Sequence, residues 1–172
     1  TGSYNVAYGA YSLDANTTAD DNTAIGYAAL GANTTGTDNT ALGKNSALLN
    51  TTGSSLVAVG VNALDENTTG DSNVSVGASS LSSNTTGSAN VAVGVNALQA
   101  STTVSNNTAV GKDAGYYVLS TGNTLVGYEA YQGAGSSAST GANNTAIGYQ
   151  ALLVNTSGTR NTAVGANSLD AN

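Results

Sequence analysis

The chain has 172 residues, of which 8% are charged, and its formal net charge of −7 comes from 3 Lys and Arg against 10 Asp and Glu. It contains no Cys and no His, which excludes disulfides, thiolate metal sites and a cysteine nucleophile, and removes the most common general base and metal ligand. Three scattered cations in an acidic chain argue against nucleic-acid binding, and the short apolar runs predict no membrane insertion.

A unit of about 17 residues repeats along the whole chain. Successive units align on a glycine that follows a mostly apolar residue, with spacings of 17 for the first six steps and then of 16, 21 and 17. The unit reads Asn-(Val/Thr)-Ala-(Val/Ile/Leu)-Gly-x-x-(Ala/Ser)-Leu-x-x-Asn-Thr-Thr-Gly-x-x, and only Leu56 replaces its first asparagine. Counting from that asparagine as position one, the aligned glycines at position five are Gly9, Gly26, Gly43, Gly60, Gly77, Gly94, Gly111, Gly127, Gly148 and Gly165.

In chain order, residues 1–4 end one unit, regular units follow, and irregular coils with a loop insertion occupy about residues 115–143 before regular units resume. The insertion adds four residues within 132–143, a stretch rich in Gly, Ser and Ala. No composition shift or linker divides the chain, so we predict a single repeat array over 1–172. Neither end has the polar cap typical of repeat arrays, and we expect the array to be a fragment of a longer fibre.

Each unit predicts one short strand followed by turns. The apolar run has three to five residues, as at 91–94, and it is dominated by β-branched residues, which favours strand over helix. The chain has no Asn-Gly or Asp-Gly pair, which disfavours a meander of hairpins. We therefore predict an all-β parallel β-solenoid, or β-roll, of ten 17-residue coils, spanning roughly 45–50 Å at a strand spacing of about 4.8 Å.

The alternation of side chains along a strand predicts which residues face the interior. We expect positions two and four, such as Val57 and Val59, to face inward and to meet the leucine of position nine. The small residues of positions three and five would then face outward and form a seam against neighbouring chains. Since one thin coil core does not offset the entropy of ordering its residues, we predict an oligomer, with a homotrimer as its form.

Stacking of equivalent positions also predicts ladders of asparagine. A side-chain amide can donate to the copy on one side and accept from the copy on the other. We expect such ladders at position one and at position twelve, the latter formed by Asn16, Asn33, Asn50, Asn67 and Asn84.

The strings Asn22-Thr-Ala-Ile-Gly-Tyr-Ala-Ala-Leu and Asn161-Thr-Ala-Val-Gly-Ala-Asn-Ser-Leu resemble the head repeat of YadA-like trimeric autotransporter adhesins. They also resemble the Asn-Thr-Thr-Gly-containing repeat of phage tail fibres. The resemblance covers essentially the whole chain, although adhesin heads usually have a shorter repeat. It implies a left-handed parallel β-roll that assembles as a homotrimer and serves as a fibre at the cell surface or on a virion. Its partners would be further copies of the chain and a glycan or protein receptor on a host surface.

The sequence predicts no catalytic, cofactor or metal site. The acidic residues drift among several positions of the unit, and the adjacent Asp20 and Asp21 are best interpreted as solvated turn residues. Serine and threonine lack a histidine to activate them, so we expect no enzyme. We predict instead a structural or adhesive fibre segment, extracellular or on a virion, that mediates attachment or spacing.

Two alternatives stay open. The first is a monomeric solenoid that binds ice or a glycan, the ice interpretation resting on ranks of threonine such as Thr17, Thr34 and Thr51. The second is a subunit of a self-assembling extracellular filament.

The candidate ligand contacts are tyrosines close to the insertion in sequence, because an exposed tyrosine is suited to stacking on sugars. They are Tyr128, Tyr131 and Tyr149. The competing interpretation is that Tyr117 or Tyr131 replaces the leucine of the core and that the insertion has no role.

Overall fold

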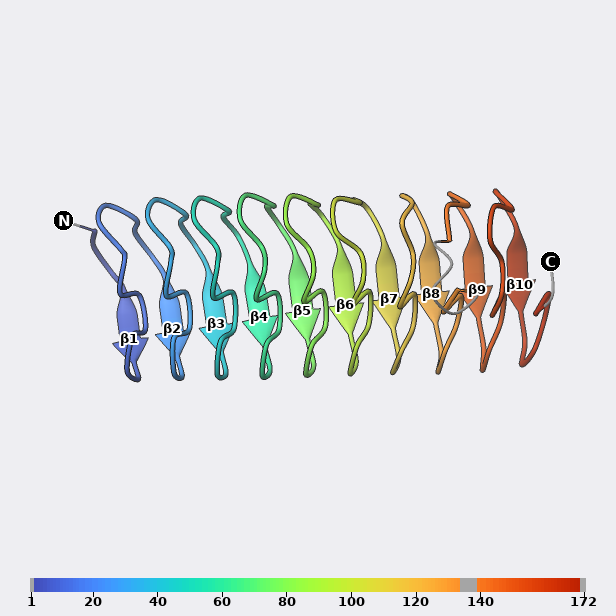
Figure 1. The fold of residues 1–172 in the computed structure, drawn as a ribbon, viewed down its shortest axis with the longest axis horizontal. Helices are drawn as coiled ribbons and strands as arrows, with labels where there is room; N and C mark the ends of the chain where they lie inside the picture. Colours follow the sequence, from blue (N-terminus) through green and yellow to red (C-terminus); the bar gives the residue numbers. More distant parts are fainter. Residues whose placement is uncertain (1, 134–138, 171–172) are drawn as a thin grey trace.

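The computed structural model describes residues 2–133 and 139–170, and these form an all-β parallel β-solenoid without helices. Ten strands of three residues each lie side by side in chain order in a single sheet (Figure 1). The strands are β1 Val6–Tyr8, β2 Thr23–Ile25, β3 Thr40–Leu42, β4 Val57–Val59, β5 Val74–Val76, β6 Val91–Val93, β7 Thr108–Val110, β8 Thr124–Val126, β9 Thr145–Ile147 and β10 Thr162–Val164. The predicted parallel solenoid is confirmed.

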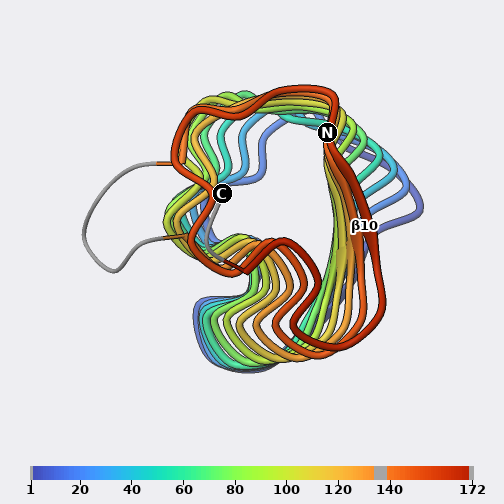
Figure 2. The ribbon, with the colours of Figure 1, turned by 90° about the vertical axis from the view of Figure 1, so that its right-hand side faces the viewer.

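Equivalent positions of successive units pair with one another. Val57 pairs with Val74, and Val74 pairs with Val91, one full unit apart. The irregular coils keep this register, since Thr108 pairs with Thr124 and Thr124 with Thr145, 16 and 21 residues apart. Seen along the stack, the coils lie almost over one another and turn progressively from one end to the other (Figure 2).

Backbone pairing between coils continues beyond the strands. The amide of Leu30 donates to the carbonyl of Ser46 at 3.0 Å, and the amide of Thr34 donates to the carbonyl of Thr51 at 2.9 Å. These bonds satisfy polar groups of the turns that would otherwise be buried without a partner. The coil is therefore held to its neighbours along most of its perimeter.

The expected orientation of the strands is wrong. The residue in the middle of the strand points inward, and Ala58, Ala92 and Ala109 are fully buried. The flanking positions two and four point outward, and Leu42 at position four is 46% exposed. The reason is space: the coil interior is narrow, and the leucine of position nine fills it when the facing residue is alanine. The predicted outward seam is therefore wrong for its alanines, which line the core, while most of the glycines of position five are half-buried at the end of the strand.

Left-handed backbone at non-glycine residues recurs at positions seven, nine and seventeen of the coil. Leu30 at position nine has φ 49° and is fully buried, and Asn62 at position seven has φ 55°. A leucine in this conformation costs free energy, whereas asparagine tolerates it because its short side chain bonds locally. Leucine keeps this conformation at position nine despite the free-energy cost, because the turn places its side chain in the core.

The glycine at position five is required both by its dihedral angles and by the next coil. Gly94 has φ +134°, and a Cβ built on it would lie 2.5 Å from the carbonyl oxygen of Gly111. The same approach recurs along the column, so each glycine makes room for the following coil of the same chain. The close backbone approach at these glycines is made by the next coil of the same chain.

The ladder at position twelve is present and buried over four of its five predicted members. Asn50 Nδ2 donates to Asn33 Oδ1 at 2.9 Å, Asn67 donates to Asn50 at 2.9 Å, and Asn84 donates to Asn67 at 2.8 Å. Asn16 is the exception. Its Nδ2 donates to the carbonyl of Ala19 at 3.2 Å, as Asn33 does to that of Gly36, but its Oδ1 accepts no hydrogen bond from a described residue.

Position fifteen explains that exception. In most other turns it is glycine, and a Cβ on Gly36 would lie 2.6 Å from Asn33 Oδ1. Ala19 has a Cβ at this position, so the side-chain amide of Asn16 cannot lie where the amides of the other ladder asparagines lie. Where Val104 occupies position fifteen, position twelve is Ser101, whose shorter side chain donates to the carbonyl of Val118 at 2.6 Å.

The asparagines at position one form a second column, and their side chains make hydrogen bonds with backbone groups. Asn39 Oδ1 accepts from the amide of Leu56 at 2.9 Å, and Asn39 Nδ2 donates to the carbonyl of Gly53 at 3.0 Å. Leu56 interrupts the column, which resumes when Asn73 Oδ1 accepts from the amide of Asn90 at 3.0 Å. Each amide thereby satisfies two backbone groups at a buried corner of the coil.

The irregular coils keep the core filled by compensating changes. Gly115 replaces the leucine of position nine, and Leu125 replaces the alanine of position three on the next coil. A Cβ on Gly115 would lie 2.7 Å from Leu125 Cδ1 and 2.9 Å from Leu98 Cδ2. The space that one leucine would occupy is therefore taken by its neighbours.

Candidate functional site

The outward side of the sheet is a continuous uncharged surface, which we call the strand face. It consists of the side chains at positions two and four of β1 to β10, all of them Thr, Val, Ile, Leu or Tyr. Ile147 is 39% exposed and Val164 67%, while Val59, Val76 and Val93 in the middle of the sheet are half-buried. Apart from the unpaired backbone edges of β1 and β10, this face is the part of the strands that can meet another molecule, since their other side is the core.

The charges of the chain lie away from the strand face. The acidic residues occupy positions seven, ten, eleven, sixteen and seventeen of the unit, which are turn positions. They are Asp14, Asp20, Asp21, Asp38, Asp65, Glu66, Asp71, Asp113, Glu129 and Asp170. Two molecules that meet through their strand faces would therefore not bring these carboxylates directly together.

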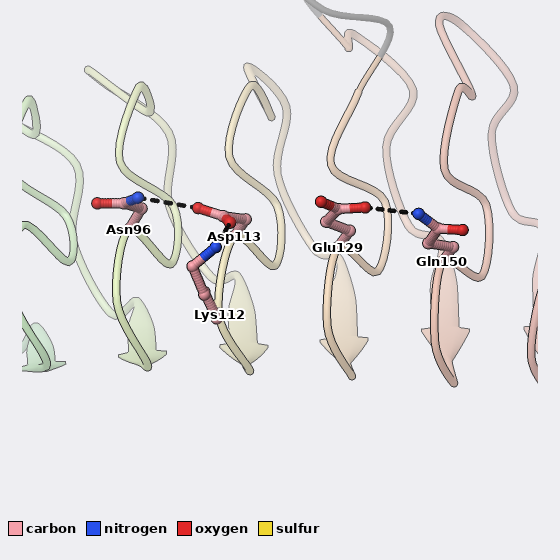
Figure 3. Close-up of polar contacts among 5 residues, drawn as sticks. All are labelled: Asn96, Lys112, Asp113, Glu129 and Gln150. Carbon is pink, nitrogen blue, oxygen red and sulfur yellow. Dashed lines mark hydrogen bonds and ion pairs between the residues drawn. The ribbon is translucent and has the colours of Figure 1, made fainter.

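A polar column stands at position seven on four successive coils (Figure 3). Asn96 Nδ2 donates to Asp113 Oδ1 at 2.9 Å, and Gln150 Nε2 donates to Glu129 Oε2 at 2.6 Å. The two amides flank the two carboxylates, which stand on neighbouring coils. The amide hydrogen bonds partly offset the repulsion between those carboxylates.

Lys112 completes this polar column from position six. Its Nζ lies 2.8 Å from Asp113 Oδ2 (Figure 3) and 5.2 Å from the ring centroid of Tyr128. The hydrogen bond and charge of Asp113 raise the pKa of the Lys112 amine above its usual value. The amine thus neutralises one carboxylate and covers one side of an aromatic ring.

Tyr128 and Tyr149 continue the row at position six. Their ring centroids lie 5.6 Å apart with an interplanar angle of 15°, and the residues are 39% and 50% exposed. A hydrogen bond to Glu129 raises the pKa of the Tyr128 hydroxyl, which links the aromatic row to the polar column. Together they form one open face of aromatic, acidic and amide groups, with no pocket found among the described residues.

Tyr131 does not belong to this surface. It is fully buried at position nine in place of leucine, and its hydroxyl donates to the carbonyl of Gly141 at 3.0 Å. The expectation of a ligand contact at Tyr131 is therefore corrected, and the competing interpretation, a tyrosine in the core, describes it. Tyr117 is half-buried and lies against Tyr116, with 4.4 Å between ring centroids.

The insertion is described at its two ends only. Val118 forms a parallel bridge with Ser139, and the amide of Leu119 donates to the Ser139 carbonyl at 2.9 Å. The middle of the predicted loop, 134–138, lies outside the described residues. What is described of the insertion continues the stacking of the coils.

The threonine ranks expected to order water are used by the fold. Thr34 Oγ1 donates to the carbonyl of Thr51, and Thr51 Oγ1 to that of Thr68, both at 2.9 Å. A different row of threonines faces outward at position two. It comprises Thr23, Thr40, Thr108, Thr124, Thr145 and Thr162, and Val57, Val74 and Val91 interrupt it.

In the described ranges, no group of three or more acidic residues is placed to hold a metal ion. Asp20 Oδ1 accepts a hydrogen bond from the amide of Ser3 at 2.6 Å. The same ranges contain no helix that could cross a membrane.

Sequence reasoning missed the polar column and the role of Lys112. The signal was present in the aligned units, because position seven is acidic on two consecutive coils and position six reads Lys, Tyr and Tyr on three. Residues of equal position become neighbours in a solenoid, so comparing consecutive units column by column would have brought them together.

The chain matches no family model, no curated protein and no solved structure at a significant level.

Proposed function

We propose that this chain is a structural or adhesive segment of an extracellular fibre, on a cell surface or a virion, and that it assembles as a homotrimer of left-handed solenoids. It acts mechanically, without catalysis: the stacked coils form a stiff rod that spaces or presents an attachment site. The resemblance to adhesin heads and tail fibres supports the fibre role.

The observation that carries the proposal is the uncharged strand face. Leu42, Ile147 and Val164 are exposed apolar residues on one flat side of the sheet, and an aligned row of such residues is typical of a surface that meets a partner. A second copy of the chain matches this face best, because its rows of side chains have the same spacing along the rod.

The area of the strand face is small for a contact between two copies. Strands about 4.8 Å apart and residues about 3.3 Å long give the ten three-residue strands a face of roughly 500 Å². A stable interface buries about 800 Å² on each partner, so one pairwise contact through this face is small. The choice of three copies therefore rests on the resemblance to trimeric adhesin heads.

Sedimentation velocity and light scattering test the proposal. We expect a species of about three times the chain mass of 16.7 kDa. The substitution Val93→Glu places a charge in the middle of the strand face and should convert this species to folded monomer, with an unchanged β-type circular dichroism spectrum.

The matched control is Val154→Glu, at a valine that is 36% exposed in a turn position away from the strands. It introduces the same charge and should leave the trimer intact. A wild-type chain that sediments as a monomer at all concentrations, or a Val93→Glu variant that stays trimeric, would contradict the proposed assembly.

A second candidate is favoured by one observation, the outward threonines of position two. Hydroxyls such as those of Thr124 and Thr145 project from a regular sheet on adjacent coils, an arrangement suited to ordering water in a monomeric ice-binding solenoid. Thermal hysteresis of the purified chain would favour this candidate over the fibre. The filament interpretation stays a prediction, and electron microscopy would test it.

A further inference from the structure

We propose that the face formed by Lys112, Asp113, Tyr128, Glu129 and Tyr149 binds a neutral oligosaccharide that lies along the solenoid axis. This inference deepens the adhesive part of the proposed function by naming a ligand class. It uses residues beyond the glycine turn at the end of each strand, so it does not require the strand face.

The aromatic component is the row of Tyr128 and Tyr149. An exposed tyrosine offers a flat apolar ring and a polar hydroxyl, which suit the C–H face and the hydroxyl groups of a sugar. Lys112 Nζ lies over the Tyr128 ring, and the ring of Tyr149 stacks against the Tyr128 ring. The position-six residue on the coil after Tyr149 is Ala166, a small side chain that leaves Tyr149 the more accessible of the two rings.

The polar component stands beside the rings at position seven. Glu129 is half-buried and offers carboxylate oxygens, which accept hydrogen bonds from sugar hydroxyls, and Gln150 offers an amide that can donate and accept. Asp113 is buried, and its two oxygens are bound by Asn96 and Lys112, so it positions these neighbours. The bonds from Asn96 and Gln150 hold both carboxylates in place before a ligand arrives. Such preorganised groups lose little entropy on binding.

The spacing of the coils and the negative charge of this face indicate which class of ligand it binds. Equivalent residues repeat at the strand spacing of about 4.8 Å, so a linear chain of sugars that runs beside the polar column can meet one coil per unit. Because Lys112 of the preceding coil lies over the Tyr128 ring and Tyr149 of the following coil stacks on it, the ring face open to a sugar is that of Tyr149. Two carboxylates beside one amine leave this face negative within a chain of net charge −7. The face therefore disfavours uronic and sialic acids and favours uncharged sugars.

The chain carries a matched comparison for Tyr149. Tyr27 also stands at position six and is 51% exposed, against 50% for Tyr149. Its neighbour at position seven is Ala28, and the following coils carry the amides Asn45 and Asn62 at position seven but no carboxylate. A tyrosine that acts only by being exposed would contribute equally at both places.

The experiment presents the full chain to an array of neutral and acidic oligosaccharides and follows the hits by saturation-transfer NMR. Tyr149→Ala and Glu129→Gln should each weaken binding of the neutral hits roughly tenfold or more, and Tyr27→Ala should leave it unchanged. No binding to any sugar, preference for acidic sugars, or equal losses in Tyr27→Ala and Tyr149→Ala would overturn the proposal.

Measuring the sedimentation of the same variants separates this inference from the proposed assembly. Tyr149→Ala should lose sugar binding and keep the oligomeric state of the wild type, whereas Val93→Glu should lose the trimer. A chain that binds sugar as a monomer would retain the inference and contradict the trimer.

Discussion

At the scale of single residues, the coil is shaped by backbone conformations that most side chains avoid. Position five combines φ near +135° with the carbonyl of the next coil, as at Gly94 and Gly111. Only glycine meets both requirements, one conformational and one steric. The coils can therefore stack at this spacing only with glycine at position five, and substitution measures how much each glycine contributes to stability.

Replacing Gly94 with alanine should destabilise the chain strongly. A Cβ there would lie 2.5 Å from the Gly111 carbonyl oxygen, and the left-handed region adds strain of about 1–3 kcal/mol. The control is Gly165→Ala, where φ is +123° but no atom lies within 4 Å of the added Cβ. Urea unfolding should show a clearly larger loss for Gly94→Ala, and equal losses would mean that conformation alone requires glycine.

Asp65 should make the stability depend on pH. Burial raises the pKa of its carboxyl from 3.8 to about 6, and the charge of Glu66 adds to the effect. Its Oδ1 is buried and has no hydrogen-bond partner in the described residues. Because the folded-state pKa is raised, ionising this carboxyl destabilises the fold above about pH 6, and protonation removes the penalty as the pH falls toward 4.

Thermal unfolding between pH 7 and pH 4 checks this expectation. The substitution Asp65→Asn should raise the Tm at pH 7 and change it little at pH 4. Asp71→Asn, which removes an acidic charge from an exposed turn, controls for the net charge. If both variants shift the Tm by the same amount at every pH, Asp65 has no special role.

At the scale of the structural element, the side chains that face each other inside the coil have complementary volumes. Alanine at position three faces leucine at position nine, and the chain departs from this rule where Leu125 packs into the space left by Gly115. Leu125 is fully buried, as are Leu64 and Leu98 at position nine, so in these coils the volume lost at one position is regained at the other.

A double-mutant cycle should reveal this coupling. Leu125→Ala alone leaves a cavity and should cost about 2–5 kcal/mol. Gly115→Leu alone overfills the same space and should cost about 1–3 kcal/mol. The double variant restores the regular pair and should be nearly as stable as the wild type, and additive losses in urea unfolding would show that the two sites are independent.

At the scale of the whole molecule, the stack holds together by repetition along one axis. Each strand pairs only with the strands of the neighbouring coils, from β1 to β10, and the asparagine columns run in the same direction. Such quasi-one-dimensional molecules bury a small core in each repeat. The strand face is the surface through which further burial between copies is available.

The proposed trimer predicts that stability depends on protein concentration. Association stabilises the folded state by mass action, so the Tm should rise when the chain concentration is increased a hundredfold. Differential scanning calorimetry at several concentrations measures this. Val93→Glu, which is expected to be monomeric, should have a Tm independent of concentration, and a wild-type Tm that does not move would count against the trimer.

The sequence by itself determined the period, the strands and the columns. Units that align at Gly60, Gly77 and Gly94 are stacked one on another, and Asn33 to Asn84 form the predicted ladder, because equal spacing places like residues together in a parallel solenoid. The exception at Asn16 depends on the Cβ of Ala19, a local effect that the repeat pattern did not show.

Only the tertiary structure decided which side of each strand is the core. The alternation of side chains along a strand allows either of two sets of residues to face the core. Composition favoured the wrong set, because Val57 and Val59 are more apolar than Ala58. The interior accommodates leucine from position nine only against a small residue, so the valines face outward and Ala58 is buried. The burial of Tyr131 and the grouping of Lys112 with Asp113 and Tyr128 likewise depend on how neighbouring coils fill space, which the pattern within one unit does not contain.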